Sequence, residues 1–243
     1  LRLEHTEVHI WRASLNQSPT RINEFLGTLT SDEKVKANRF HSAKKRNQFI
    51  VAHGLLRVIL GCYYINAAPE QLRFFYNSYG KPYIADELNK DKLKFNMSHS
   101  HGIVLYAFTS GREVGVDIEY IRPDIADEQI AERFFSQREL AELQSLPQEK
   151  QKKAFFYFWT CKEAYLKARG EGISLPLDSF EVSMIQGKPV ALLSTKSGSQ
   201  EISRWSILNL QLESGYIGVL VVEGNNQGNQ DLRLFGQTLK TIS

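Results

Sequence analysis

Two carboxylates in one short segment could hold a metal ion between them. The segment Gly115–Glu119, GVDIE in one-letter code, alternates apolar and acidic residues and is typical of a β-strand. Side chains two positions apart on a strand point the same way, so Asp117 and Glu119 share one face while Val116 and Ile118 face the core. Adjacent carboxylates repel each other, and a divalent cation between them removes the repulsion. The alternative is an amphipathic strand with its acidic face in water.

A third carboxylate lies on a predicted helix over residues 152–169. Trp159, Glu163 and Lys167 are four positions apart and form one stripe along this helix. Glu163 can therefore join the acidic pair, and Lys167 places a cation one turn away. The alternative is an ordinary Glu–Lys surface pair, worth about 0.2–0.5 kcal/mol. A second stripe, spaced i, i+3, i+4, i+7, should face the core and consists of Cys161, Ala164, Tyr165 and Ala168.

Hydrogen-bonding side chains gather at residues 95–101, FNMSHSH, where a predicted strand runs into a loop. Ser98 and His99 in this loop could hold phosphate oxygens. His99 and His101 could instead bind a metal, but the sequence has no further His or Cys cluster to complete a zinc site. A capped turn with an exposed histidine is the third interpretation.

Two basic elements could add contacts for an anion. Lys44 begins a Lys-Lys-Arg run just before a predicted helix over residues 48–60. Lys81 lies in the predicted turn Tyr79–Pro82, YGKP, where Gly80 lets the backbone approach a ligand closely. Both lysines could equally be solvated charges.

The secondary structure that positions these candidates can be predicted from the sequence. In each half of the chain, the pattern predicts helices followed by strands. Helices are expected from Thr30 or Ser31 onward, at 48–60 with Gly61 as its end, at 125–144, and at 152–169 with Gly170 as its end. Strands are expected at residues 7–15, 72–84 (with a turn), 94–97, 103–108, 113–121, 178–185, 189–193, 204–212 and 216–223.

This order favours an α+β fold of two similar lobes, residues 1–112 and 113–223, with a polar C-terminal tail at 224–243. One larger α+β domain is the alternative. The 243 residues are 42% hydrophobic and 23% charged, the balance of a soluble globular protein. The absence of a run of 18 apolar residues argues against a transmembrane helix, and Cys62 and Cys161 are expected as reduced, buried thiols.

Charge is unevenly distributed along the chain. The formal net charge of +3 is too small to indicate nucleic-acid binding. Residues 31–57 nevertheless carry seven Lys or Arg against two acids, whereas residues 113–142 carry nine acids against three Arg. The first segment suits an anion and the second a cation, although solvated helix faces would give the same pattern.

Six motifs in this order resemble the surfactin-type (Sfp-like) 4'-phosphopantetheinyl transferase family. They are YGKP, FNMSHS, GVDIE, RFFSQREL, FWTCKEAYLKA and GISLPLDSF, all within residues 79–180. The resemblance extends more loosely over residues 8–222, and the wording SDEKVKANRF and WTCKEAYLKA is most similar to cyanobacterial members. It implies two similar α+β lobes, a pseudo-dimer within one chain, with the active site in the cleft between them.

The resemblance also implies roles for individual residues. Asp117, Glu119 and Glu163 match the magnesium ligands, and Glu163 and Lys167 are the expected catalytic residues, with Lys167 near the pyrophosphate. Glu139, in RFFSQREL, matches a family acid of less certain role. The residues expected to contact coenzyme A are Lys44, Tyr79, Gly80, Lys81, Pro82, Ser98, His99 and Lys167.

The implied reaction moves 4'-phosphopantetheine from coenzyme A to a serine of an apo carrier protein of fatty acid, polyketide or nonribosomal peptide synthesis. It depends on Mg²⁺ and releases 3',5'-ADP. The serine hydroxyl needs a base, which would be Glu163 directly or through a metal-bound water. The enzyme is expected to be a cytoplasmic monomer that binds neither nucleic acid nor membrane. A metal-dependent phosphohydrolase and a non-catalytic binding module for coenzyme A or the carrier are the alternatives, and the complete carboxylate trio argues against the module.

The carrier should dock on a surface that combines positive charge with apolar side chains, because carriers of this pathway are generally acidic. The candidates are Arg122, Arg133 and Arg138, with an apolar contact from Phe134 or Phe135. Alternatively, the phenylalanines belong to the core and the arginines pair with nearby acids.

Overall fold

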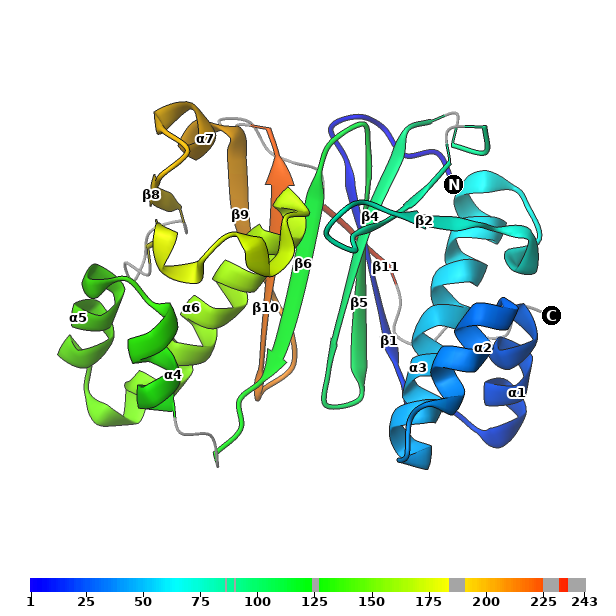
Figure 1. The fold of residues 1–243 in the computed structure, drawn as a ribbon, viewed down its shortest axis with the longest axis horizontal. Coiled ribbons are helices and arrows are strands. Elements are labelled where there is room, and N and C mark those ends of the chain that lie inside the picture. Colours follow the sequence, from blue (N-terminus) through cyan, green and yellow to red (C-terminus); the bar gives the residue numbers. More distant parts are fainter. Residues whose placement is uncertain (86, 90, 124–126, 184–190, 225–231, 236–243) are drawn as a thin grey trace.

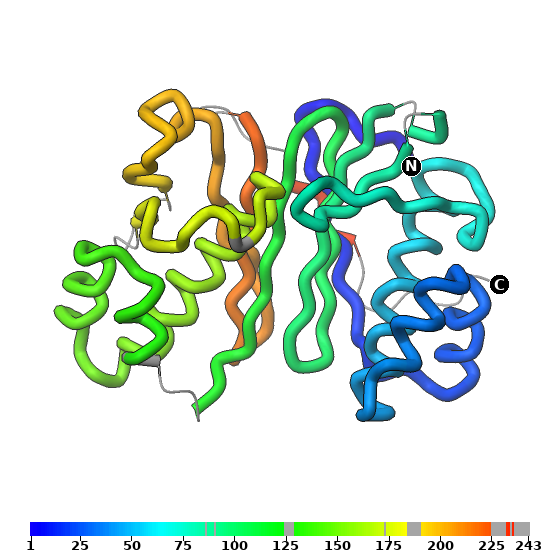
Figure 2. The backbone as a smooth tube through the Cα atoms, in the orientation of Figure 1, coloured from blue at the N-terminus to red at the C-terminus, as the bar shows by residue number. Residues whose placement is uncertain are grey.

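The computed structural model describes residues 1–85, 87–89, 91–123, 127–183, 191–224 and 232–235. The described chain forms two lobes, each with a sheet toward the centre of the molecule and helices on the outside (Figure 1). Figure 2 shows the same order of layers, helices, sheet, sheet and helices, along the longest axis. The expected α+β fold of two lobes is therefore confirmed.

The first lobe contains a four-stranded sheet, a two-stranded hairpin and three helices. The sheet has the order β11-β1-β5-β4. Its strands are β1 (Val8–Ser14), β4 (Leu93–Ser100), β5 (Ile103–Ser110) and β11 (Leu232–Phe235), and the hairpin strands are β2 (Phe74–Tyr76) and β3 (Pro82–Ile84). The helices are α1 (Pro19–Thr28), α2 (Ser31–Asn38) and α3 (Ala43–Val58), followed by a π-helical segment Ile59–Ile65 and a 3₁₀ turn Pro69–Gln71.

The second lobe contains a three-stranded sheet, a smaller two-stranded sheet and four helices. The sheet orders are β6-β10-β9 and β7-β8. The strands are β6 (Val114–Tyr120), β7 (Phe180–Val182), β8 (Leu192–Thr195), β9 (Trp205–Leu210) and β10 (Tyr216–Glu223). The helices are α4 (Asp127–Phe134), α5 (Gln137–Ser145), α6 (Gln148–Arg169) and α7 (Ser199–Arg204), with 3₁₀ turns at Gly172–Ser174 and Leu177–Ser179.

The two sheets pack face to face through alternate residues of their strands. Each lobe also has its own core between its sheet and its helices. The first-lobe core includes Phe25 and Leu55, and the second-lobe core includes Phe158 and Tyr165. A third cluster lies between the sheets and joins the lobes into one body. It contains Val8, Ile10, Leu105, Ala107, Val114, Val116, Ile118, Leu220 and Val222.

Helix starts follow the capping residues in the sequence. Thr30 caps α2 and forms a reciprocal capping box with Glu33, which confirms the predicted start of that helix. Ser136 forms the same box with Glu139, and it separates α4 from α5 within the segment that was predicted as one helix. Helix α6 starts four residues earlier than predicted and ends as expected at Gly170, which has a left-handed backbone (φ 69°).

The helix expected to end at Gly61 continues instead as a π-helix to Ile65. Gly61 is buried there. A larger residue would not fit, because a Cβ at this position would lie 2.5 Å from the carbonyl oxygen of Ala67. The left-handed residue Asn66 (φ 56°) ends the segment. By length and composition alone, Ala43–Ile65 could cross a membrane, which the sequence analysis did not expect. In this structure its apolar side packs in the first-lobe core.

Residues 98–100 belong to strand β4 rather than to the predicted loop. The chain reverses only at His101 (φ 45°) and Gly102 (φ 90°), a two-residue hairpin turn that needs two positive φ angles. The stretch predicted as a tail, 224–243, contributes β11, which pairs in parallel with β1 and was not predicted. Helices α1 and α7 were not predicted either.

Candidate active site

Strands β4 and β6 lie beside each other where the lobes meet, and polar side chains of β4 connect them. The side-chain oxygen of Asn96 accepts a hydrogen bond from the backbone N–H of Val116 at 2.9 Å. The hydroxyl oxygen of Ser100 accepts one from the N–H of Tyr120 at 3.1 Å. These side chains replace the backbone ladder that an ordinary pair of strands would form. The polar alternation in FNMSHS is therefore a strand pattern that faces the second lobe.

The same alternation binds the two acidic residues of β6. The Ser98 hydroxyl donates to Oδ1 of Asp117 at 2.8 Å, and the Ser100 hydroxyl donates to Oε2 of Glu119 at 3.0 Å. Both carboxylates thus lie on the face of β6 that Gly115 presents to α6, and side chains of β4 reach them from the other lobe, which confirms the predicted common face. Asp117 is only 4% exposed, so the alternative of an acidic face in water does not hold for this residue. Val116 and Ile118 are buried on the opposite face, as expected.

Lys167 joins this group from helix α6. Its ammonium lies 2.6 Å from Oδ1 of Asp117 and donates to the Ser98 hydroxyl at 2.9 Å and to the Val116 carbonyl at 3.4 Å. The structure therefore brings together three residues that are far apart in the sequence. The other oxygen of Asp117, Oδ2, is buried and has no hydrogen-bond partner within the described chain.

Helix α6 can reach β6 this closely because residue 115 is a glycine. A Cβ on Gly115 would lie 2.1 Å from the Ala164 carbonyl oxygen and 2.3 Å from the Ala168 nitrogen. Real Cβ atoms do not approach backbone atoms to such distances, so only glycine fits. The apolar stripe of α6 predicted to face the core is fully buried and consists of Cys161, Ala164, Tyr165 and Ala168.

Glu163 and Glu119 interact electrostatically with Asp117. The pKa of Glu163 is raised by burial and by the charges of Asp117 and Glu119, although Lys167 opposes this. The pKa of Glu119 is raised by burial and by Asp117, while the Ser100 hydrogen bond opposes this. Negative charge is therefore in excess around Asp117. Within the described residues, no three His, Cys, Asp or Glu side chains stand arranged as metal ligands.

His99 is exposed on β4, and Lys167 and Asp117 are among its electrostatic neighbours. Its pKa is lowered because the surrounding protein partly desolvates it and because the nearby Lys167 ammonium opposes a second positive charge. His53, on α3, was not singled out by the sequence analysis. A single histidine within an apolar helical pattern carries no signal that would place it beside β4.

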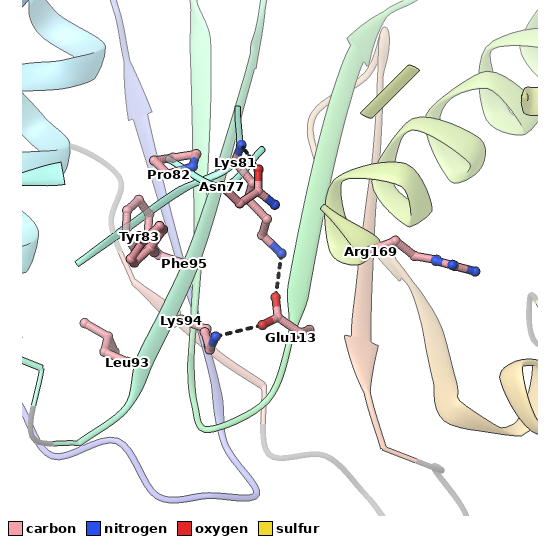
Figure 3. A pocket seen from close by; sticks show the side chains of 9 residues that line it. All are labelled: Asn77, Lys81, Pro82, Tyr83, Leu93, Lys94, Phe95, Glu113 and Arg169. Carbon is pink, nitrogen blue, oxygen red and sulfur yellow. Dashed lines mark hydrogen bonds and ion pairs between the residues drawn. The ribbon is translucent and has the colours of Figure 1, made fainter. Parts of the chain in front are cut away.

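The YGKP turn is docked on the second lobe. Asn77 organises the turn, because its side-chain oxygen accepts hydrogen bonds from the N–H groups of Tyr79 and Lys81, each at 2.9 Å. Gly80 has a positive φ of 88°, and Tyr79 is exposed. Beside the turn lies a pocket of about 170 Å³ whose lining includes Lys81, Pro82 and Glu113 (Figure 3).

Lys81 and Lys44 were predicted as contacts for an anion, and their surroundings in the structure differ from each other. The Lys81 side chain is 13% exposed, and its ammonium is bound to protein acceptors rather than free for a phosphate. Lys44 is exposed in the first turn of α3, and among the described contacts none joins it to the other candidate residues. Asn77, Asn96 and Glu113 were missed, because their roles depend on partners in the other lobe.

Glu139 has a structural environment. Its carboxylate lies 2.7 Å from the Lys162 ammonium, and both side chains are almost fully buried. Lys162 also donates to the carbonyls of Leu177 and Phe180, each at 2.7 Å. Burial raises the pKa of Glu139 and lowers that of Lys162, since it disfavours both charges. The Glu139–Lys162 pair therefore connects α5 and α6 to the start of β7. Lys162 directly precedes Glu163 in the sequence.

Comparison with known proteins identifies the family. A model of the 4'-phosphopantetheinyl transferase superfamily matches residues 113–218, and one of the N-terminal part of 4'-phosphopantetheinyl transferases matches residues 11–110. The 4'-phosphopantetheinyl transferase HetI of Nostoc sp. is 40% identical over 92% of this chain and 91% of its own. This chain belongs to the 4'-phosphopantetheinyl transferase family.

Other relatives are similar over shorter spans. The 4'-phosphopantetheinyl transferase Sfp of Bacillus subtilis is 33% identical over 69% of this chain and 72% of its own. The solved holo-[acyl-carrier-protein] synthase of Neisseria meningitidis covers 46% of this chain with a TM-score of 0.40 and 22% identity, over 98% of that chain. The expected Sfp-like, cyanobacterial resemblance is confirmed, and so is the enzyme class. The chain is a transferase that moves phosphopantetheine from coenzyme A to a carrier protein.

Proposed function

We propose that transfer takes place at the group formed by Asp117, Glu119, Glu163 and Lys167, between the lobes, with Mg²⁺ as cofactor. The observation that carries this proposal is the carboxylate of Asp117. One of its oxygens is paired with Lys167 and Ser98, while the other is buried without a partner in the described chain. A buried carboxylate oxygen that no donor satisfies is costly, and a hard cation satisfies it well.

The other two carboxylates support the same cation. Burial and the charge of Asp117 raise the pKa of both Glu119 and Glu163. The positive charge of Lys167 nearby therefore does not fully compensate the negative charge of these carboxylates. Asp117, Glu119 and Glu163 would hold the ion through oxygen ligands, the type that Mg²⁺ prefers. When bound, Mg²⁺ would neutralise charge on the pyrophosphate and on the departing 3',5'-ADP.

The side chains of this enzyme then account for the remaining chemistry. The carrier serine oxygen attacks the phosphorus attached to pantetheine, and the bond from this phosphorus to the 3',5'-ADP oxygen breaks. Glu163 would accept the serine proton as the general base. Lys167, held by Ser98 and Asp117, adds fixed positive charge where the pyrophosphate must lie.

Coenzyme A would lie along the edge of the first lobe. His99 is exposed beside Lys167 and can donate a hydrogen bond to a phosphate oxygen. The turn residues Tyr79, Gly80 and Pro82 would meet the adenosine end, with Gly80 letting the backbone come close. Lys44 stays a candidate for the 3'-phosphate, whereas the ammonium of Lys81 has its own protein acceptors.

Incubation with coenzyme A, Mg²⁺ and an apo carrier protein tests the proposal. A mass gain of one phosphopantetheine on the carrier is expected from the wild type, and His99→Ala should weaken coenzyme A binding by about tenfold, the value of one charge-assisted hydrogen bond. His5→Ala removes an exposed imidazole of the N-terminal segment that has no proposed role, and it is the control. Phosphate or ADP release without carrier would indicate a hydrolase, and binding without turnover a binding module.

We propose that the protein acts in the cytoplasm as a monomer. Cys62 and Cys161 are both free thiols, which suits the reducing cytoplasm; Cys161 is buried as expected, but the expectation that Cys62 is buried is wrong, because it is exposed. Both lobes that flank the proposed site belong to one chain, so a monomer would suffice for activity. Neither nucleic acid nor a membrane is proposed as a partner.

A further inference from the structure

The ammonium of Lys81 has three acceptors, and all of them lie in the second lobe or at its start. It donates to the Glu113 carboxylate at 2.7 Å, to the Ala168 carbonyl at 2.9 Å and to the Val114 carbonyl at 3.2 Å. An ammonium has three hydrogens, so each finds a protein acceptor. Figure 3 shows the side chain crossing from the YGKP turn to Glu113. Little capacity is left for a ligand.

Two of the donors from this turn cap the end of α6. The last carbonyls of any helix lack partners within the helix and carry partial negative charge. Lys81 satisfies the Ala168 carbonyl, and the Asn77 amide donates to the Gly170 carbonyl at 2.8 Å. The C-terminus of α6 is therefore capped by side chains that belong to the other lobe.

The fit at this contact is close. A Cβ on Gly170 would lie 2.8 Å from Cδ of Lys81 and 3.2 Å from the amide nitrogen of Asn77. Burial lowers the pKa of Lys81, while Glu113 opposes this by supplying the opposite charge. The contact is thus packed, desolvated and charge-compensated.

The capped turn of α6 carries the proposed chemistry. Lys167 precedes Ala168 directly, and Glu163 lies one turn earlier. We propose that Lys81, together with Asn77, is a positioning residue that holds the C-terminal turn of α6 against β6, so that Lys167 stays paired with Asp117. This inference rests on the proposed function, and it replaces the expectation that Lys81 binds coenzyme A.

Lys94 offers a matched control. Its ammonium lies 2.8 Å from the other oxygen of Glu113, but no described contact joins it to α6. Lys81→Met and Lys94→Met each remove one ammonium from the same carboxylate, and each leaves the other ammonium in place. Only Lys81→Met leaves the carbonyls of Val114 and Ala168 without their donor.

Steady-state kinetics and calorimetric binding of coenzyme A separate positioning from binding. At saturating coenzyme A, Lys81→Met should lower kcat about tenfold while the Kd for coenzyme A changes less than twofold. Lys94→Met should change both quantities less than twofold. Lys81→Arg, which keeps a charged donor, should recover part of kcat. If Lys81→Met raises the Kd for coenzyme A tenfold or more while kcat is unchanged, Lys81 contacts coenzyme A and is not a positioning residue. If Lys81→Met and Lys94→Met lower kcat equally, the loss comes from the removed charge beside Glu113 and the positioning role is refuted.

Hydrogen exchange of residues 167–171 tests the inference without turnover. Lys81→Met should speed exchange of these amides at least fivefold relative to the wild type, and Lys94→Met should not. Asn77→Asp removes the second donor but keeps the oxygen that accepts from the N–H groups of Tyr79 and Lys81, and it serves as the second variant if Lys81→Met fails to fold. Unchanged exchange in both Lys81→Met and Asn77→Asp would overturn the positioning role. Failure of the wild type to modify a carrier would instead refute the proposed function, whatever the exchange rates.

Discussion

The hydroxyl of Ser98 donates to Oδ1 of Asp117 at 2.8 Å, so a side chain of the first lobe fixes a carboxylate of the second. Lys167 contacts both groups. The other oxygen of Asp117 is buried and has no donor among the described residues, so protein contacts fix only one side of this carboxylate. We therefore expect substitution of Asp117 to lower kcat much more than substitution of Ser98.

Asp117→Ala should lower kcat by at least a thousandfold, because loss of a ligand to a catalytic metal removes several kcal/mol of charge stabilisation. Ser98→Ala should cost only about tenfold, since one hydrogen bond to a charged group is worth about 1.5–3 kcal/mol. Transfer of phosphopantetheine to an apo carrier is measured over a range of Mg²⁺ concentrations. Near-normal turnover of Asp117→Ala at low Mg²⁺ would remove Asp117 from the metal site.

Gly115→Ala should destabilise the protein by about 1–3 kcal/mol and lower activity about a hundredfold. The added methyl meets backbone atoms of Ala164 and Ala168, which cannot move without moving α6. A displacement of Lys167 and Glu163 by about 1 Å is enough for such a loss in rate. Urea unfolding and transfer kinetics measure the two effects.

Gly27→Ala is the matched control for this substitution. Gly27 lies in α1, and a Cβ there has no atom within 4 Å. Alanine is the better helix former, so the free energy of unfolding should rise by up to about 1 kcal/mol with activity unchanged. If both variants behave alike, the close approach of α6 to β6 is not what Gly115 provides.

Local patterns predicted the elements of the site but not how they meet. The alternation of GVDIE gave strand β6 and its two faces, and the stripes of α6 gave Glu163 and Lys167 their common side. The partners of these residues come from β4, which lies in the other lobe, and no local pattern specifies such a pairing. Ser98 and His99 were assigned to a loop for that reason, because polar residues in a strand are unexpected until their partners are known.

Lys81 illustrates the same limit at a single residue. A lysine in a glycine-containing turn suggests a ligand contact, yet its ammonium is used by Ala168 and Glu113. Strand β11 was missed for a related reason, since four residues after a polar stretch give too short a pattern to predict pairing with β1.

Glu33 should make the stability of the first lobe depend on pH in acid. Burial alone would raise its pKa, but the nearby His53 and the hydrogen bonds from Arg57 and Thr30 lower it from 4.5 to about 2. A lowered pKa means that the stabilisation is complete above about pH 4.5 and is lost as the pH falls toward 2. At about 1.4 kcal/mol per pKa unit, the loss amounts to about 3 kcal/mol of unfolding free energy.

Urea unfolding of Glu33→Gln between pH 2 and 5 measures this contribution. The variant should be less stable than the wild type at pH 5, and its unfolding free energy should fall less steeply as the pH decreases. Asp32→Asn is the control, because Asp32 lies in the same helical turn but is exposed. An equal slope in Glu33→Gln and the wild type would show that the buried contact with Arg57 does not carry the dependence.

The carrier should dock beside the end of α4 rather than on the first lobe. Phe135 is only 3% exposed and belongs to the core, so it is excluded as a contact. Phe134 is half-buried against Trp159, with ring centroids 5.7 Å apart, and Trp159 lies one turn from Glu163 on α6. The exposed Arg133 lies over the Phe134 ring. An apolar group and a cation are thus combined close to the proposed base.

Arg133→Glu and Arg138→Glu should raise the carrier KM at low salt, because both arginines are exposed and would face an acidic partner. The effect should shrink as salt rises, since the Debye length falls from about 10 Å at 0.1 M to about 3 Å at 1 M. The KM for coenzyme A should stay unchanged, because no described contact joins Arg133 or Arg138 to Lys167, His99 or the YGKP turn. Arg21→Glu, on α1 of the first lobe, makes the same charge change and is the control. Unchanged carrier KM in both second-lobe variants, with a raised value in Arg21→Glu, would move the docking surface to the first lobe.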